Sequence, residues 1–255
     1  MCLWSTCGSM NEWHNPDAET LEDLGRAGMH LIQPKRQFRY GTDSVLLSDF
    51  AASKRFTKGI DLGAGSGVIA LLLAARMPNA HMDCVEIRPW AADILERNIR
   101  MNGMEERMRA HCGDMREAFA FFGREKYDLA VSNPPYYDAI TSPHSPYEAM
   151  NTARQDADCS PRDLCRAAFS LLKTGGRFCV VYASARAMAL LRAMEEHRIA
   201  PKRIRCVQDT PYRAPKLLLV EGVKQGGEGL IWMPPLILHD ENGNETMEYR
   251  RIYNF

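Results

Sequence analysis

Lys58-Gly59-Ile60-Asp61-Leu62-Gly63-Ala64-Gly65-Ser66-Gly67 is the stretch that decides the fold of this chain. Its first half predicts a strand over 58–62 that ends at a glycine-rich turn. The three glycines of the turn let the backbone pass close to a ligand at the start of the next helix. That helix is predicted over 68–76 and stops before Pro78. A strand, a tight turn and a helix in this order begin an alternating α/β fold.

Strands and helices continue to alternate outward from this unit. The predicted strands are 58–62, 81–87, 108–112, 127–132 and 177–182, and the predicted helices are 68–76, 89–101, 161–172 and 185–197. Two final strands, 202–208 and 216–222, lack a helix between them, and Pro211 and Pro215 lie in their linker. We therefore expect a single doubly wound α/β domain. Its Rossmann-like sheet is mostly parallel and seven-stranded, with an antiparallel hairpin at one edge.

The two ends of the chain are harder to place than its centre. Residues 1–35 are expected to be an N-terminal lead segment, with a short helix near 19–24, and residues 36–255 the folded domain. A helix is predicted to begin at Ser44, after a cap at Thr42 or Asp43. Segments 230–238 and 249–255 are expected to form an extended arm packed on that domain.

Composition restricts the possible classes of protein. The chain has 255 residues, 45% of them hydrophobic, and a formal net charge of zero. No apolar run is long enough to span a membrane, and no signal peptide is evident. The eight cysteines lack Cys-x-x-Cys spacing, which predicts no metal site and favours a reducing cytoplasm. Neutral charge excludes a globally basic nucleic-acid binder, so any RNA contact must use local patches.

The strand over 127–132 leads into Asn133-Pro134-Pro135-Tyr136, a pattern suited to methyl transfer onto a planar nitrogen. An exocyclic amine is a poor nucleophile because its lone pair is delocalised into the ring. The Asn133 side-chain oxygen and the Pro134 carbonyl, held by two prolines of fixed φ, can accept its hydrogens and draw the nitrogen toward tetrahedral geometry. Tyr136 offers a stacking face worth about 1–3 kcal/mol per base. The alternative for the tetrapeptide alone is a strand-end loop punctuated by prolines.

Three acidic residues at strand ends favour S-adenosylmethionine as the cofactor. Ligands of open α/β sheets bind beyond the carboxyl ends of the strands. Asp61 can reach the cofactor's ammonium group directly or through water, Glu86 can accept its ribose hydroxyls, and Asp114 can accept from its adenine amine. Glu86 or Asp114 on its own would most simply be a solvated acid at a strand end. A dinucleotide site also uses the second-strand acid, but it has no use for the Asn-Pro-Pro-Tyr segment.

These residues together resemble the class I methyltransferases that modify exocyclic amines or amides. More narrowly, the chain is similar to the bacterial tRNA(Val) adenine N6-methyltransferase family. The narrower resemblance rests on Phe38-Arg39-Tyr40-Gly41-Thr42-Asp43-Ser44-Val45-Leu46-Leu47 and on 199–204, 217–222, 234–236 and 252–253. It implies that Tyr40 and Thr42 line the methionine end of the cofactor and that a flipped-out adenine is held at 133–136.

The site expected from the motifs and the resemblance has two parts. The expected catalytic residues are Asn133, Pro134, Pro135 and Tyr136. The expected cofactor-binding residues are Tyr40, Thr42, Asp61, Gly63, Gly65, Gly67, Glu86, Ile87, Asp114, Met115 and Asn133.

The predicted activity is S-adenosylmethionine-dependent N6-methylation of an adenine in tRNA, by resemblance the anticodon-loop adenine of valine tRNA. A monomer or weak homodimer is expected. Alternatives are a protein-glutamine N5-methyltransferase, which would typically carry a helical domain before the methyltransferase fold, and an rRNA adenine N6-methyltransferase. A DNA adenine methyltransferase would usually have a target-recognition insertion. A non-catalytic binding module and an NAD oxidoreductase are less favoured, given the acids and Asn133.

Basic residues that could contact RNA occur near both ends of the predicted domain. Each of them alone is most simply a solvated surface charge. The group over 202–216 is expected to form a patch beside the cleft. The candidates are Lys35, Arg36, Arg39, Lys202, Arg203, Arg205, Arg213 and Lys216.

Overall fold

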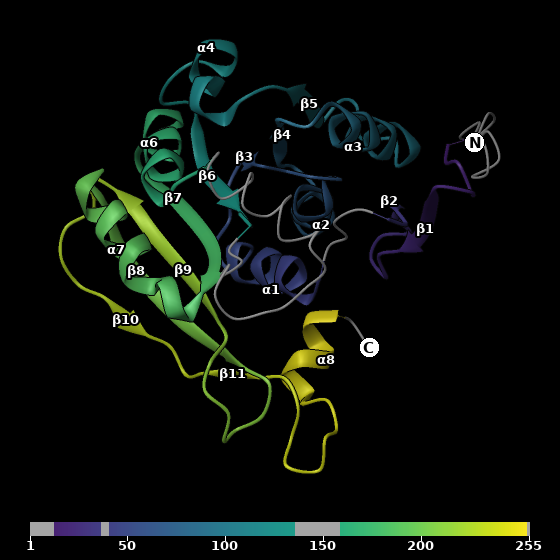
Figure 1. Cartoon of the computed structure of the whole chain (residues 1–255). Coiled ribbons are helices and arrows are strands. Elements are labelled where there is room, and N and C mark those ends of the chain that lie inside the picture. The colour runs from purple at the N-terminus through teal and green to yellow at the C-terminus, as the bar shows by residue number, and fades with distance from the viewer. Residues whose placement is uncertain (1–12, 37–40, 136–158, 254–255) are drawn as a thin grey trace.

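A central sheet organises the computed structural model, which describes residues 13–36, 41–135 and 159–253 (Figure 1). Its main strands are β3 (Lys58–Leu62), β4 (His81–Glu86), β5 (Met108–Cys112), β6 (Tyr127–Ser132), β7 (Leu172–Ala183), β8 (Ile199–Gln208) and β9 (Leu217–Lys224). They lie in the order β8-β9-β7-β6-β3-β4-β5. Strands β3 to β7 pair in parallel, whereas β9 runs antiparallel to both β7 and β8. The prediction of a mostly parallel sheet with an antiparallel edge hairpin is confirmed.

Over the described residues the sheet has nine strands, so the predicted number of seven is corrected. Strands β10 (Ile231–Trp232) and β11 (Leu236–Ile237) pair in parallel with the outer side of β8. Each has two residues, too few for a periodic sequence signal. Pro234 and Pro235, which lie between them, also cannot donate to a strand ladder. The segment 230–238 therefore extends the sheet instead of packing on it as an arm.

Helices cover both faces of the sheet (Figure 1). One face carries α1 (Thr42–Ala51), α2 (Val68–Arg76) and α3 (Pro89–Met101), and the other carries α4 (Ala118–Phe122), α6 (Pro161–Leu171) and α7 (Ala187–Glu196). The alternation of side chains along β6 serves both layers, since Leu129 and Val131 pack on the first face and Ala130 on the second. Short turns η2 (Met115–Glu117) and η3 (Ser184–Arg186) follow β5 and β7. Within the described ranges, no helix is both long and apolar enough to cross a bilayer.

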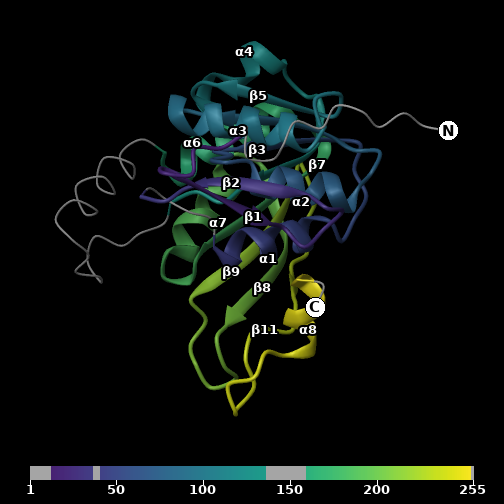
Figure 2. The same cartoon turned by 90° about the vertical axis from the view of Figure 1, so that its right-hand side faces the viewer.

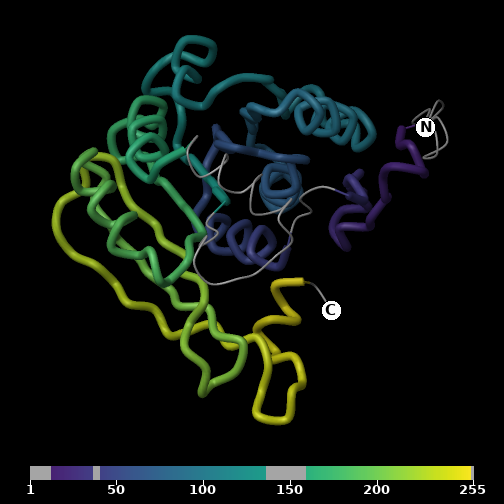
Figure 3. Tube along the Cα trace, viewed as in Figure 1, coloured from purple at the N-terminus to yellow at the C-terminus, as the bar shows by residue number. Residues whose placement is uncertain are grey.

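The N-terminal region forms a hairpin of β1 (Glu19–Asp23) and β2 (His30–Pro34), so the predicted short helix near 19–24 is wrong. The hairpin is fixed by contacts distant in sequence, which a local pattern does not reveal. Asn98 of α3 donates to the Ile32 carbonyl at 3.1 Å and accepts from the Ile32 amide at 2.7 Å. Figure 3 shows the hairpin beside α3. The domain boundary at residue 35 remains a prediction.

The chain turns into helix α8 (Met247–Tyr253) near its C-terminus, where the sequence analysis expects an extended arm. Tyr249, Ile252 and Tyr253 share one helical face, at spacings of three and four residues, and pack against the core. The helix lies beside α1 and β11 (Figure 2). The sequence contains the apolar spacing of a helix, but a helix of seven residues is too short for that spacing to predict it.

Candidate active site

A pocket of about 270 Å³ lies at the carboxyl ends of β3, β4 and β6. Parallel strands bring these ends to one edge of the sheet, where ligands of α/β proteins bind. The structure brings most of the predicted site residues together there. Those that line the pocket are Gly63, Gly65, Glu86, Ile87, Asp114, Met115, Asn133, Pro134 and Pro135.

The glycine turn closes one side of the pocket in a backbone conformation that favours glycine. The φ angles are 79° at Gly63, 56° at Gly65 and 88° at Gly67. The Gly63 amide donates to the Val85 carbonyl at 2.9 Å, which ties the turn to β4. A Cβ at Gly67 would lie 2.3 Å from Leu95 Cδ1, whereas a Cβ at Gly65 would meet no atom of the described residues within 4 Å. Gly67 therefore serves the start and packing of α2, and Gly65 leaves space for a ligand against the backbone.

Glu86 is a buried carboxylate at the end of β4, and both of its oxygens have partners. Oε2 accepts from the Gly65 amide at 2.8 Å. Oε1 accepts from the Arg88 amide at 3.0 Å and from Arg88 Nε at 2.7 Å. Since each oxygen has two lone pairs, Oε2 retains one acceptor position for a ribose hydroxyl. A second hydroxyl would have to replace a hydrogen bond from Arg88.

Asp61 lies at the end of β3, fully buried and outside the lining of the pocket. Among the residues that the structure describes, neither of its carboxylate oxygens has a partner within hydrogen-bond geometry. Burial, followed by the negative charge of Glu86, raises the pKa of Asp61 to about 8, and the nearby Ala70 amide offsets only part of this rise. An unpartnered buried carboxyl group is costly, so a ligand cation or a bridging water would stabilise it. This environment fits the predicted contact with a cofactor ammonium group.

Asp114 presents an ionised acceptor at the pocket, directly after β5. Its Oδ1 accepts from the Arg116 amide at 2.8 Å, and Arg116 Nε donates to Oδ2 at 2.8 Å. These hydrogen bonds from Arg116 lower the pKa of Asp114. The acid is therefore held in place by its own turn, with Met115 beside it in the pocket wall.

Asn133 is held from two sides. The preceding residue, Ser132, is fully buried and donates to the Leu62 carbonyl at 2.6 Å, which fixes the end of β6 against the end of β3. The Asn133 Nδ2 group donates to Ser44 Oγ at 3.1 Å. Ser44 lies in the first turn of α1 and also lines the pocket. Ser44 carries no signal in the sequence, because its link to Asn133 crosses 89 positions.

Three described residues of the predicted site, Thr42, Asp61 and Gly67, do not line the described part of the pocket. Tyr40 and Tyr136 lie outside the described residues, as does the candidate RNA contact Arg39. The Thr42 hydroxyl lies 3.4 Å from the Tyr249 hydroxyl of α8, and Thr42 is not in the pocket wall. Helix α1 begins at Thr42 with Gly41 as its N-cap, so neither Thr42 nor Asp43 is the cap itself.

Arg88 and Trp90 also line the pocket, directly after β4, and are not among the predicted site residues. The Arg88 guanidinium lies 5.1 Å from the centre of the Trp90 ring. An arginine and a tryptophan just before and inside a helix carry no specific sequence signal. Their relevance comes from Glu86, which positions Arg88 at the pocket.

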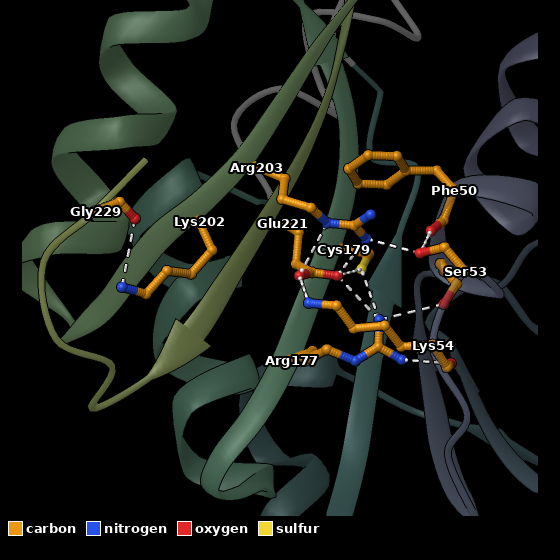
Figure 4. A network of polar contacts seen from close by, with 10 residues as sticks. Phe50, Ser53, Lys54, Arg177, Cys179, Lys202, Arg203, Glu221 and Gly229 are labelled. Atoms are coloured by element: carbon orange, nitrogen blue, oxygen red, sulfur yellow. Dashed lines mark hydrogen bonds and ion pairs between the residues drawn. The ribbon is translucent and has the colours of Figure 1, made fainter. Parts of the chain in front are cut away.

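The basic patch predicted over 202–216 is divided in the structure. Figure 4 shows Lys202 directed at the Gly229 carbonyl and Arg203 directed at Glu221. Arg205 forms an ion pair with Glu248 at 2.7 Å. These three side chains are engaged in contacts inside the protein. Lys216, in contrast, is exposed at the sheet edge that carries the pocket.

Comparisons with known proteins identify the family. A family model described as methyltransferase small domain matches residues 35–202. A tRNA1(Val) (adenine(37)-N6)-methyltransferase from a Flavobacteriaceae bacterium is 32% identical over 191 residues, covering 74% of this chain and 78% of its own. This chain belongs to the family of tRNA1(Val) (adenine(37)-N6)-methyltransferases. A protein of the same name from Porphyromonas gingivalis is 31% identical over 224 residues, covering 84% of this chain and 86% of its own.

Solved structures support the same fold for this methyltransferase. A predicted O-methyltransferase from Agrobacterium tumefaciens has a TM-score of 0.68 at 20% identity, covering 83% of this chain and 95% of that one. P. horikoshii TYW2 in complex with MeSAdo has a TM-score of 0.56 at 17% identity, covering 84% and 74%. These identities show the fold alone, which is that of the Rossmann-like methyltransferases.

The protein is thus an S-adenosylmethionine-dependent enzyme, and the pocket fits that cofactor. Two observations carry the fit, namely the open space in front of Gly65 and, behind the pocket wall, the buried Asp61 carboxyl, which has no partner among the described residues. Glu86 and Asp114 add acceptors for hydroxyl and amine donors at the ends of the next two strands. All of these groups lie on the edge of the sheet that also presents Asn133 and Pro134.

Proposed function

We propose that this enzyme methylates the N6 atom of an adenine in tRNA, namely adenine 37 in the anticodon loop of a valine tRNA. The observation that carries the proposal is that Asn133 and Pro134 line the same pocket as the glycine turn. Acceptors for an exocyclic amine then lie where the methyl group arrives. The RNA and the position come from the names of the relatives, which are tRNA1(Val) (adenine(37)-N6)-methyltransferases.

In the proposed cofactor site, Gly63 and Gly65 bring the backbone against the methionine part, with Asp61 near the ammonium group. Glu86 accepts from the ribose, and Asp114 accepts from the adenine amine. Ile87 and Met115 provide apolar walls for the adenine ring. Tyr40 and Thr42 remain predicted contacts at the methionine end, and Gly67 contributes through the start of α2.

When bound, S-adenosylmethionine supplies an electrophilic methyl group on a positively charged sulfur. Asn133 Oδ1 accepts one N6 hydrogen of the target adenine and the Pro134 carbonyl accepts the other. As the nitrogen–methyl bond forms and the sulfur–methyl bond breaks, these two oxygens stabilise the positive charge that develops on the nitrogen. Pro135 keeps the Pro134 carbonyl fixed, and Tyr136 is the predicted stacking partner of the base. One proton then leaves N6 to water, so no side chain has to act as a general base.

Protein-glutamine methylation is the second candidate, because a side-chain amide presents the same two hydrogens to Asn133 and Pro134. The names of the relatives favour tRNA over protein as the substrate. Residues 19–34 form a hairpin that packs against α3. We also propose that the enzyme is cytoplasmic, that it is a monomer or a weak dimer, and that it needs no metal.

The test is transfer of labelled methyl from S-adenosylmethionine to total tRNA, total rRNA and a protein extract, followed by digestion and identification of the product. Label in tRNA as N6-methyladenine is the expected result. Label in rRNA as the same base, or in protein as methylglutamine, would replace the proposed substrate. An Asn133→Ala variant serves as the background control in all three arms.

A further inference from the structure

We infer that Ser44 is a positioning residue that holds the Asn133 amide with its oxygen toward the methyl acceptor. The inference rests on the proposed function, since it assigns how the acceptor group of that site is oriented. Ser44 Oγ accepts from Asn133 Nδ2 at 3.1 Å, and both residues line the pocket. No other hydrogen bond of the Asn133 side chain occurs in the part of the chain that the structure describes.

The structure has this contact in one direction, with Asn133 Nδ2 as the donor and Ser44 Oγ as the acceptor. Asn133 has one acceptor oxygen and one donor nitrogen at the end of its side chain. If the amide turned over, its NH₂ group would face the NH₂ group of the substrate, and two donors would oppose each other. Only the orientation with Nδ2 on Ser44 allows the Asn133 oxygen to accept from the substrate while the amide nitrogen keeps a partner.

Ser44 is held firmly enough to act as this partner. Its side chain is 3% exposed, and its backbone amide donates to Asp43 Oδ1 at 2.9 Å. The neighbouring residues Val45, Leu46 and Leu47 are buried in the core between α1 and the sheet. On the other side of the contact, Ser132 fixes the backbone before Asn133. The hydrogen bond between Ser44 and Asn133 therefore joins the buried first turn of α1 to the fixed end of β6.

Removing the hydroxyl should release the Asn133 side chain without emptying the cofactor site. Small displacements of a reacting group can cost about 10²-fold in rate. We expect Ser44→Ala to lower kcat by about 10- to 100-fold while changing the cofactor Kd and the KM for RNA by less than about twofold. Ser44→Thr keeps the hydroxyl and should recover most of the lost kcat.

The matched control is Ser48→Ala. Ser48 is also buried, one turn further along α1, but it donates to the Val45 carbonyl at 2.7 Å and does not line the pocket. Its substitution should leave kcat within about twofold of wild type. Equal losses in Ser44→Ala and Ser48→Ala, or a cofactor Kd that worsens as much as kcat falls, would show that Ser44 only supports α1.

A measurement without RNA separates this inference from the proposed substrate. In ¹⁵N-labelled enzyme, the Asn133 side-chain NH₂ signals can be assigned by their absence in Asn133→Ala. We expect them to move and to exchange faster with solvent in Ser44→Ala, but not in Ser48→Ala. Unchanged signals in Ser44→Ala would overturn the inference even if wild-type enzyme methylates tRNA. Changed signals with a wild type inactive on tRNA would retain the inference and reject the proposed substrate.

Discussion

Asn133 is the side chain on which turnover should depend most directly, because its oxygen is the proposed acceptor for the substrate amine. Replacing it with alanine removes that acceptor and leaves the glycine turn and the acids of the cofactor site in place. We expect Asn133→Ala to lower kcat by about 10²- to 10³-fold, the usual loss for one preorganised polar group. The cofactor Kd, measured by calorimetry, should change by less than about threefold. Near-normal turnover would contradict the mechanism.

Asp61 makes a second prediction at the residue scale, in which cofactor binding is linked to protons. Its pKa is raised to about 8 by burial and by Glu86, so most of the free enzyme carries a protonated Asp61 at pH 7. An ammonium group brought close to Asp61 favours the carboxylate. Binding at pH 7 should therefore release about half a proton or more, as measured by calorimetry in buffers of different ionisation enthalpy. Asp61→Asn should bind more weakly and release none from this position.

The same pKa sets the direction of a stability change in the free enzyme. Because the folded-state pKa lies above the ordinary value near 3.8, the stabilising protonated form is fully present below about pH 4. That stability is lost as pH rises toward 8. Urea unfolding between pH 5 and 8 should show a decline in wild type that is smaller in Asp61→Asn. A wild-type stability that rises over this range through Asp61 would contradict the assignment.

Helix α1 is the element that joins the active site to a buried ionic cluster at its other end. Glu221 is fully buried and pairs with Lys54 at 2.7 Å, Arg177 at 3.0 Å and Arg203 at 2.6 Å (Figure 4). Arg177 also donates to the Ala51 carbonyl, the last residue of α1. The cluster therefore fixes the C-terminal end of α1, the helix whose first turn contains Ser44, the partner of Asn133.

Removing the charge of Glu221 should destabilise the fold, because it leaves the buried Arg177 and the largely buried Arg203 without their anionic partner. We expect Glu221→Gln to lower the free energy of unfolding by about 3–5 kcal/mol. The control Glu248→Gln, at the partly exposed pair with Arg205, should cost less than about 1 kcal/mol. Burial alone would raise the pKa of Glu221, but hydrogen bonds from Arg203 and Lys54 outweigh it and lower the pKa to about 2. The contribution is present above about pH 4.5 and should be lost as pH falls toward 2.

The elements that the sequence predicts well are those whose signal is local. The glycine turn, the strand over 58–62 and the helices over 68–76 and 89–101 lie as predicted, since periodicity and turn chemistry specify them. The N-terminal hairpin depends on Asn98, and the Ser44–Asn133 contact depends on how α1 packs on β7 and β9. Contacts of this kind join distant parts of the chain, so neither propensity nor spacing can reveal them.

At the scale of the whole molecule, the neutral chain must place its RNA contacts at particular positions on the edge that carries the pocket. Lys216 precedes β9, and β9 is separated from β6 by β7 alone. Two strand spacings separate β9 from β6 by about 10 Å across the sheet, and Leu217 is paired with Ala183, beyond the Val180 partner of Ser132, so Lys216 extends past the end of β6. It is exposed beside the proposed adenine site, unlike Lys202 and Arg203, whose charges are engaged within the protein.

We therefore expect Lys216→Glu to weaken tRNA binding and to reduce the slope of log affinity against log salt concentration by about 1, because one phosphate contact is lost. Lys126 is the matched control. It is equally exposed but precedes β6, at the opposite edge of the sheet, so Lys126→Glu should change neither quantity. Filter binding at several salt concentrations measures both. Equal effects of the two substitutions would mean that RNA binding responds to net charge alone. No effect of either substitution would show that RNA does not contact the β9 side of the pocket.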